Sequence, residues 1–133
     1  MPALANVEEI RTQVRERLED QRGLVETLLH LREQLPGSLF ARWSVCGKPG
    51  CPCGDGKRHG PYWVLSARSG GKGSFAYLPQ DRAEEVRSFV DRHREFRQGL
   101  KKLKQMSEEL GDLLRTYQEA MAREGGQKLG LTQ

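Results

Sequence analysis

Three cysteines and one histidine lie within fourteen residues of this chain: Cys46, Cys51, Cys53 and His59. Thiolate and neutral imidazole are typical ligands of structural zinc, and four of them complete a tetrahedral shell. The intervening glycines and prolines suit the tight turns that would bring the four side chains to one centre. A closed shell leaves no position for a reacting water, so the spacing C-x4-C-x-C-x5-H predicts a structural Zn²⁺.

Other interpretations of this cluster stay open. Asp55, or a residue of a partner chain, could replace His59 as the fourth ligand. The thiols could also hold an iron–sulfur group, act in redox chemistry or stay unligated in a glycine-rich loop. Three cysteines cannot all pair, and the chain lacks a start that resembles a signal peptide. A metal in a reducing cytoplasm is therefore favoured over disulfides.

Positive charge is concentrated around the cysteines. Between Ser38 and Gln80 the chain carries six cations and a single acid, Asp55, a net charge of +5 against +4 for the whole chain. Such a segment suits a polyanion, because phosphate contacts supply most non-specific nucleic-acid affinity, although a solubilising surface would look similar. The predicted nucleic-acid contacts are Lys48, Lys57, Arg58, Lys72, Arg42 and Arg68.

An amphipathic helix is predicted before this region, from about Ala5 to Leu35. Its apolar residues recur at steps of three, four and seven, with charged residues on the other faces. Asn6 is the predicted N-cap, and Pro36-Gly37 the predicted end.

A second and longer helix is predicted from about Asp81 to Glu124. Its apolar residues occupy alternating a and d positions over more than five heptads, which is typical of a coiled-coil seam. Asp81 is the predicted N-cap, and Gly125-Gly126 the predicted end. The first helix is expected to pack antiparallel on the start of the second, whose surplus length would form a homodimer or dock onto a partner.

Between the helices the pattern predicts three short strands: Ser38–Val45, Tyr62–Arg68 and Ser74–Leu78. The glycine-rich run in residues 69–73 is typical of a hairpin turn between the last two. Aromatic residues of these strands are expected mainly to pack the sheet against the helices: Phe40, Trp43, Trp63, Phe75 and Tyr77. Trp43, Tyr62 and Trp63 could stack on bases if they are exposed.

The predicted fold is α+β and mainly α, with two long amphipathic or coiled-coil helices flanking a small zinc-stabilised, three-stranded antiparallel β module. With 30% charged and 36% hydrophobic residues, the chain is too polar for a thick core, and it has no apolar run that suits a membrane. The predicted parts are an amphipathic helix in residues 1–37, a zinc-binding β module in 38–80, a coiled-coil helix in 81–124 and a flexible tail in 125–133.

The stretch from Cys46 to Trp63, C-G-K-P-G-C-P-C-G-D-G-K-R-H-G-P-Y-W, resembles a family of short prokaryotic proteins of unknown function. Their pattern is CGK-x-x-C-x-C followed by HGPYY, and Trp63 stands where many relatives have tyrosine. The resemblance extends from about Gly37 to the middle of the second helix. Genes of such proteins often lie near transposases, which implies a connection with mobile elements and DNA. The motif positions carried over are Cys46, Cys51, Cys53, His59, Gly60, Pro61 and Tyr62.

Two functions fit these features. The first is a small zinc-binding accessory protein that binds nucleic acid, DNA in the first place, through its basic cysteine loop. The second is an adapter whose coiled coil docks onto a larger enzyme such as a transposase or nuclease. An enzyme is not favoured, because the sequence lacks a paired-carboxylate site, a phosphate-cradling loop before a helix and a G-x-S-x-G turn.

Overall fold

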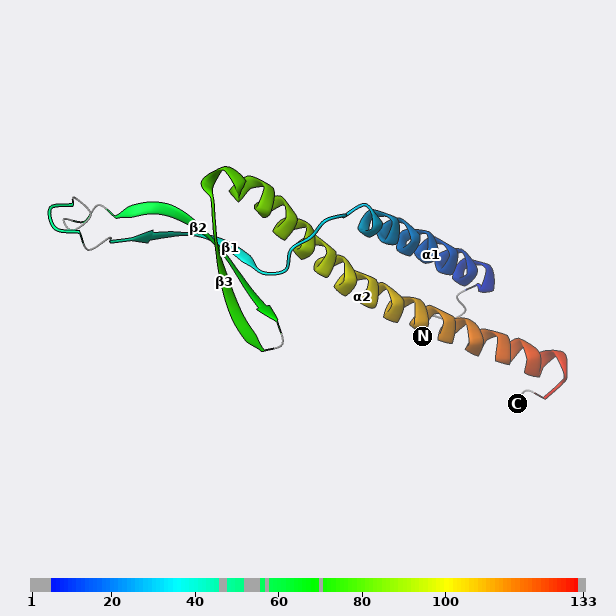
Figure 1. The fold of residues 1–133 in the computed structure, drawn as a ribbon. Coiled ribbons are helices and arrows are strands. Elements are labelled where there is room, and N and C mark those ends of the chain that lie inside the picture. Colours follow the sequence, from blue (N-terminus) through cyan, green and yellow to red (C-terminus); the bar gives the residue numbers. More distant parts are fainter. Residues whose placement is uncertain (1–5, 46–47, 52–55, 57, 70, 132–133) are drawn as a thin grey trace. The chain divides into compact units, whose positions relative to one another are not determined.

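A computed structural model describes residues 6–45, 48–51, 56, 58–69 and 71–131 of the chain. The fold is α+β and mainly helical, as predicted, with two α-helices and a three-stranded sheet (Figure 1). In chain order the elements are α1 (Val7–Leu29), β1 (Ser38–Ser44), β2 (His59–Ser69), β3 (Lys72–Leu78), a short 3₁₀ helix (Gln80–Arg82) and α2 (Ala83–Lys128).

The chain divides into two compact units. One, the helical unit, comprises Met1–His30 and Arg97–Gln133, and therefore contains α1 and most of α2. The other, the strand unit, comprises Leu31–Phe96 and contains the sheet and the first turns of α2. The residues predicted to bind metal and nucleic acid all belong to the strand unit.

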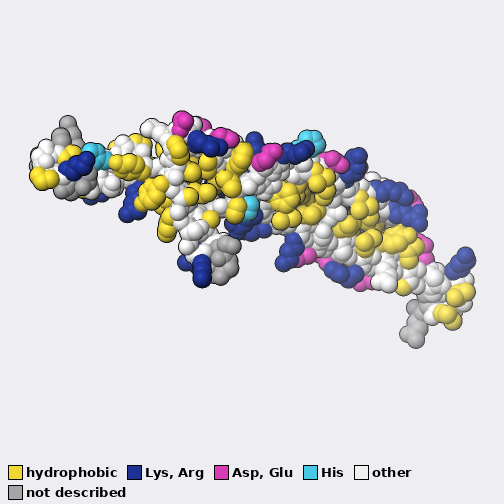
Figure 2. Space-filling view, in the orientation of Figure 1, with side chains coloured by type: hydrophobic (Ala, Val, Ile, Leu, Met, Phe, Trp, Pro, Cys, Tyr) yellow, Lys and Arg dark blue, Asp and Glu magenta, His cyan; other side chains and the backbone are white. Residues whose placement is uncertain are grey.

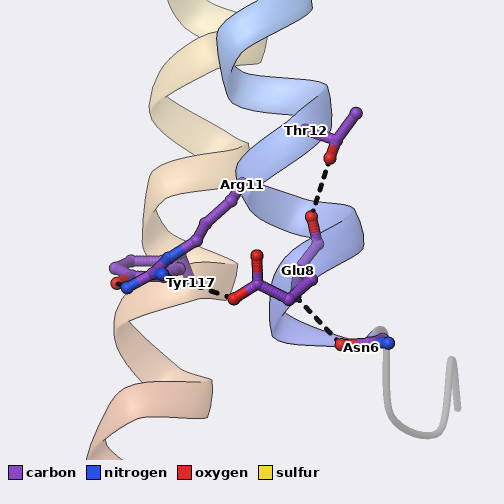
Figure 3. Close-up of polar contacts among 5 residues, drawn as sticks. All are labelled: Asn6, Glu8, Arg11, Thr12 and Tyr117. Atoms are coloured by element: carbon purple, nitrogen blue, oxygen red, sulfur yellow. Dashed lines mark hydrogen bonds and ion pairs between the residues drawn. The ribbon is translucent and has the colours of Figure 1, made fainter.

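In the helical unit α1 and α2 run antiparallel. Arg11 near the start of α1 donates a hydrogen bond to the Tyr117 hydroxyl at 3.1 Å, and its guanidinium lies over the Tyr117 ring (Figure 3). This hydrogen bond raises the pKa of Arg11 above its usual value. Further along α1, Gln21 donates to the Ser107 hydroxyl at 3.1 Å. The predicted antiparallel pairing is therefore present, but it lies along the middle of α2 and not at its start.

The N-terminus of α1 has the predicted cap. The Asn6 side chain accepts a hydrogen bond from the backbone N–H of Glu8 at 3.0 Å (Figure 3). Glu8 and Glu9 lie in the first turn, where negative charge complements the helix dipole. A side-chain cap of this kind stabilises a helix by about 1 kcal/mol.

The C-terminus of α1 lies six residues before the predicted one, because the helix ends at Leu29 and not at Leu35. The segment that follows bonds to α2 instead of continuing its own helix. The Leu35 N–H donates to the carbonyl of Phe89 at 3.1 Å, and Arg92 donates to the carbonyl of Glu33 at 3.2 Å. These tertiary hydrogen bonds override a local helical pattern.

Both predicted ends of α2 were wrong by a few residues. Asp81 lies inside the 3₁₀ turn that precedes the helix, so it is not the N-cap. At the other end α2 passes through Gly125-Gly126 and stops at Lys128. Gly130 has φ +69° and the Leu131 N–H donates to the Gly126 carbonyl at 2.8 Å, which is the hydrogen-bond pattern of a Schellman C-cap.

The predicted antiparallel sheet is confirmed, with strand order β1-β2-β3. β2 is central and pairs with β1 from Ser38↔Ser66 to Ser44↔His59. It pairs with β3 from Trp63↔Leu78 to Ser69↔Lys72, which confirms the hairpin between the last two strands. The loop that carries the cysteines joins β1 to β2, as predicted.

The core is small in both units. In the helical unit the buried apolar residues are Ile10, Leu28 and Ala120, and in the strand unit they are Val64, Ala83, Val86 and Val90. Leu100 and Leu114 of the predicted coiled-coil seam remain about half exposed. Within the described residues, neither helix has an apolar stretch that could cross a bilayer.

Candidate functional site

The structure describes two of the four predicted zinc ligands, and it brings these two together. Cys51 Sγ lies 3.1 Å from His59 Nε2. Cys46 and Cys53 lie outside the described residues, as does Asp55, the alternative ligand. Within the described part of the chain, no group of three or more histidine, cysteine or acidic residues is placed to hold a metal ion.

The separation of Cys51 and His59 bears on whether both could bind one zinc ion. In a tetrahedral site with Zn–S of about 2.3 Å and Zn–N of about 2.0 Å, the sulfur and nitrogen ligands lie roughly 3.5 Å apart. The 3.1 Å separation is shorter than this value and is a hydrogen-bonding distance for a thiol and an imidazole, and both side chains are half-buried. These two groups are therefore close enough to each other to be considered as two ligands of one zinc ion.

Positive-φ glycines accompany the turns on both sides of Cys51. Gly50 has φ +79° and Gly56 has φ +103°, and residues with a Cβ atom rarely adopt such positive values. The Cys51 N–H donates to the carbonyl of Lys48 at 3.3 Å, which closes the turn before the cysteine. Both glycines were predicted to allow the chain to fold back between ligands, and their backbone conformations agree with that role.

A β-bulge places His59 at the start of β2. Between the pairs Arg42↔Tyr62 and Ser44↔His59 the register shifts, because β1 contributes one residue there and β2 contributes two. The two residues of β2 are Gly60 and Pro61, joined by a cis peptide bond, and they stand against Trp43 alone. The strand therefore begins three residues earlier than the predicted Tyr62, and His59 is part of the sheet.

Gly60 leaves no room for a side chain. It has φ +144°, and a Cβ built on it would lie 2.8 Å from the carbonyl oxygen of Arg42 and 3.0 Å from the Trp43 ring. The first neighbour is backbone and cannot move aside without breaking the strand pairing. This close approach fixes the bulge that positions His59.

Substitution Gly60→Ala is expected to destabilise the β1–β2 hairpin by more than about 1 kcal/mol. Alanine is strained at this positive φ, and its Cβ would clash with Arg42 and Trp43. The midpoint of thermal unfolding, followed by tryptophan fluorescence, measures the loss. Gly73→Ala is the matched control, since Gly73 lies in β3 outside the positive-φ range and has no atom within 4 Å of a built Cβ. An equal midpoint for wild type and Gly60→Ala would contradict the steric argument.

The predicted nucleic-acid contacts are exposed wherever the structure describes them. They are Arg42, Lys48, Arg58, Arg68 and Lys72, whereas Lys57 lies outside the described residues. Arg42 donates a hydrogen bond to the Tyr77 hydroxyl at 3.1 Å. Because the only acid between Ser38 and Gln80 is Asp55, this segment of the chain has a strong positive bias.

The aromatic residues of the sheet are more exposed than expected. The prediction that they pack the sheet against the helices was wrong for Phe40, Trp43, Phe75 and Tyr77, which are 39%, 52%, 67% and 63% exposed. Trp63 is half-buried, and the Arg87 guanidinium of α2 lies over its ring at 5.0 Å. Figure 2 shows hydrophobic and basic side chains at the surface over the strands.

Sequence reasoning missed that several of these residues share one face of the sheet. Residues directly opposite each other in an antiparallel pair lie on the same face, and alternate residues of a strand return to it. The signal was present in the alternation Tyr62, Val64, Ser66, Arg68 and in Phe75 and Tyr77 two residues apart. Finding the face also required the register, which the sequence pattern does not determine.

A family model described as "Domain of unknown function (DUF6788)" matches residues 8–88, more than half of the chain. The matched segment runs from the first turn of α1 to the first turns of α2 and includes the entire sheet. No match was found among curated proteins or among solved structures.

Proposed function

Because the chain belongs to this family of unknown function, we propose a role from its own residues: a small zinc-binding accessory protein that binds nucleic acid through the basic strand unit. DNA is the favoured nucleic acid, since the cysteine motif resembles proteins encoded near transposases. The proposed setting is therefore mobile-element or other DNA-processing machinery, in a reducing cytoplasm where thiols stay available to a metal.

One observation carries this proposal, namely the segregation of charge. Every described cation between Ser38 and Gln80 is exposed, and the single acid of that stretch cannot neutralise six cations. The rest of the chain is almost neutral, with sixteen cations and seventeen acids. Such a segment attracts phosphates through its excess of positive charge.

Zinc has a structural role in this proposal. Cys51 and His59, whose Sγ and Nε2 atoms lie 3.1 Å apart, are proposed as one sulfur and one nitrogen ligand, and Cys46 and Cys53 are proposed to complete the shell. When bound, the metal crosslinks the loop between β1 and β2 and offsets part of its conformational entropy. Lys48 and Arg58, which belong to this loop, are then held in place for phosphate contacts.

A protein adapter is the second candidate function, and exposed aliphatic side chains in the helical unit favour it. Five of them are between 38% and 64% exposed: Leu18, Val25, Leu29, Leu100 and Leu114. Leu100 and Leu114 belong to the predicted coiled-coil seam, so the same side chains would serve a homodimer or a larger enzyme. Native mass spectrometry of the purified protein distinguishes these two partners, because a homodimer doubles the mass and a larger enzyme adds its own mass.

Removing three of the cations is expected to weaken nucleic-acid binding and its salt dependence together. The variant is Lys48→Gln with Arg58→Gln and Lys72→Gln, and binding is measured by fluorescence anisotropy between 50 and 200 mM NaCl as the experimental range. Each lost phosphate contact reduces the slope of log affinity against log salt by about 0.7 to 0.9. The triple variant should therefore have a slope shallower by roughly two units or more.

The matched control removes the same charge from the helical unit. Lys101, Lys102 and Lys104 are exposed residues of α2, and their conversion to glutamine lowers the net charge by an equal amount. This control should keep most of the wild-type affinity and slope. Equal losses in both variants would show that only net charge matters, and no loss in the first variant would refute the proposed interface.

A further inference from the structure

One face of the sheet collects aromatic and arginine side chains from all three strands. The register places Arg42 opposite Tyr62, and Phe40 opposite Val64, which in turn lies opposite Tyr77. Further along, Ser66 lies opposite Phe75, and Arg68 lies opposite Gly73. We call this the ring face; its members are Phe40, Arg42, Tyr62, Arg68, Phe75 and Tyr77, around a buried Val64.

The rings of this face are accessible. Phe40 and Tyr62 are 39% and 44% exposed, and Phe75 and Tyr77 are 67% and 63% exposed. The hydrogen bond from Arg42 to the Tyr77 hydroxyl joins β1 to β3, so it crosses the central strand β2 on this side of the sheet. Trp63, whose ring contacts Arg87 of α2, belongs to the opposite face.

The charge and chemistry of the ring face select one kind of occupant. None of its register positions is acidic, and arginines stand near its two ends, at Arg42 and Arg68. Between Tyr62 and Arg68 the strand spans about 20 Å at roughly 3.3 Å per residue. Flat rings in a row between cations suit flat bases joined by phosphates.

We propose that the ring face is a stacking platform for the bases of a single-stranded nucleic acid. Exposed aromatic rings on a sheet can stack two or three unpaired bases, while arginines contact the phosphates between them. A duplex cannot use the rings in this way, because its base faces are covered by neighbouring base pairs. The inference deepens the proposed function and depends on nucleic-acid binding itself.

Binding measurements with three probes test this platform: a single-stranded 12-mer, the same strand without bases, and a 12-base-pair duplex. The wild type is expected to bind the single strand more tightly than the abasic strand, which has the same phosphates. Phe75→Ala and Tyr77→Ala should each weaken single-strand binding by about tenfold, and the double variant by on the order of 100-fold. None of these three variants should change binding of the abasic strand or of the duplex by more than a factor of about two.

Two further variants separate stacking from folding. Tyr77→Phe keeps the ring and removes only the hydroxyl that accepts from Arg42, so it should retain near wild-type affinity. Phe75→Leu keeps an apolar side chain at an exposed position without an aromatic face, and it should bind as weakly as Phe75→Ala. Circular dichroism and thermal unfolding of every variant should match the wild type, because both side chains are mostly exposed.

Different results overturn different claims. Unchanged single-strand binding by a folded Phe75→Ala, Tyr77→Ala double variant would refute the stacking platform. It would not contradict phosphate binding by the strand unit. Equal affinity of the wild type for abasic and normal strands would do the same. Failure of the wild type to bind any of the three probes would overturn both the platform and the proposed function.

Discussion

Freshly purified protein should carry one zinc ion per chain, and replacing Cys51 by serine should remove most of it. Structural zinc sites contribute apparent binding free energies of about 10 to 16 kcal/mol at neutral pH, which exceeds any single packing effect in a chain of this size. The close approach of Cys51 Sγ and His59 Nε2 at 3.1 Å is the observation behind this expectation. Elemental analysis and native mass spectrometry measure the metal content.

Loss of the zinc ion should also lower the stability of the protein. Trp43 lies near the end of β1, opposite the bulge at Gly60 and Pro61, so its fluorescence should report loosening of the hairpin after chelation. Lys48→Ala is the matched control, because it changes the same loop without removing a ligand and should keep full zinc content. A folded, metal-free protein whose thermal unfolding is unaltered by a chelator would exclude structural zinc.

Substitution Gly99→Leu is expected to destabilise the helical unit by about 1 to 3 kcal/mol through overpacking. A Cβ built on Gly99 would lie 2.4 Å from Leu28 Cδ2, and Leu28 is only 5% exposed, so it has little space to move. Leucine is a better helix former than glycine by about 1 kcal/mol, and any loss is therefore steric in origin. Urea denaturation followed by circular dichroism gives the free energy of unfolding.

Gly125 provides the control for this substitution. It lies in the same helix, but a Cβ built on it meets no atom within 4 Å. Gly125→Leu should therefore leave stability unchanged or raise it by up to about 1 kcal/mol. The pair Gly99→Leu with Leu28→Ala completes a double-mutant cycle, in which the second change should relieve part of the first. Equal stability of Gly99→Leu and the wild type would show that the two helices do not pack as described.

Much of the fold followed from local patterns, because the relevant forces are local. Apolar residues at helical spacing predicted both helices, and Asn6 predicted the N-cap of α1. Alternation and glycine-rich turns predicted three strands and their antiparallel pairing. The proximity of Cys51 to His59 also agrees with the spacing of the cysteine motif.

The errors arose where distant residues decide the structure. The helical pattern of α1 continues to Leu35, but the Leu35 N–H bonds to Phe89, 54 residues further along the chain. Gly125-Gly126 resembles a helix end, yet Gly130 supplies the positive φ that ends α2. Phe75 and Tyr77 have large aromatic side chains of the kind that often pack in a core. Only the folded structure shows that they are exposed and share one face of the sheet.

The regular pairing of β2 from Tyr62 to Arg68 has a consequence for variation among related chains. Side chains alternate between the two sides of a strand, so one residue inserted between Tyr62 and Arg68 would transfer part of the aromatic row to the opposite side. Length changes in the turn after Ser69 would leave that row undisturbed. Natural insertions and deletions should therefore accumulate in the turn, while the six-residue interval from Tyr62 to Arg68 stays constant.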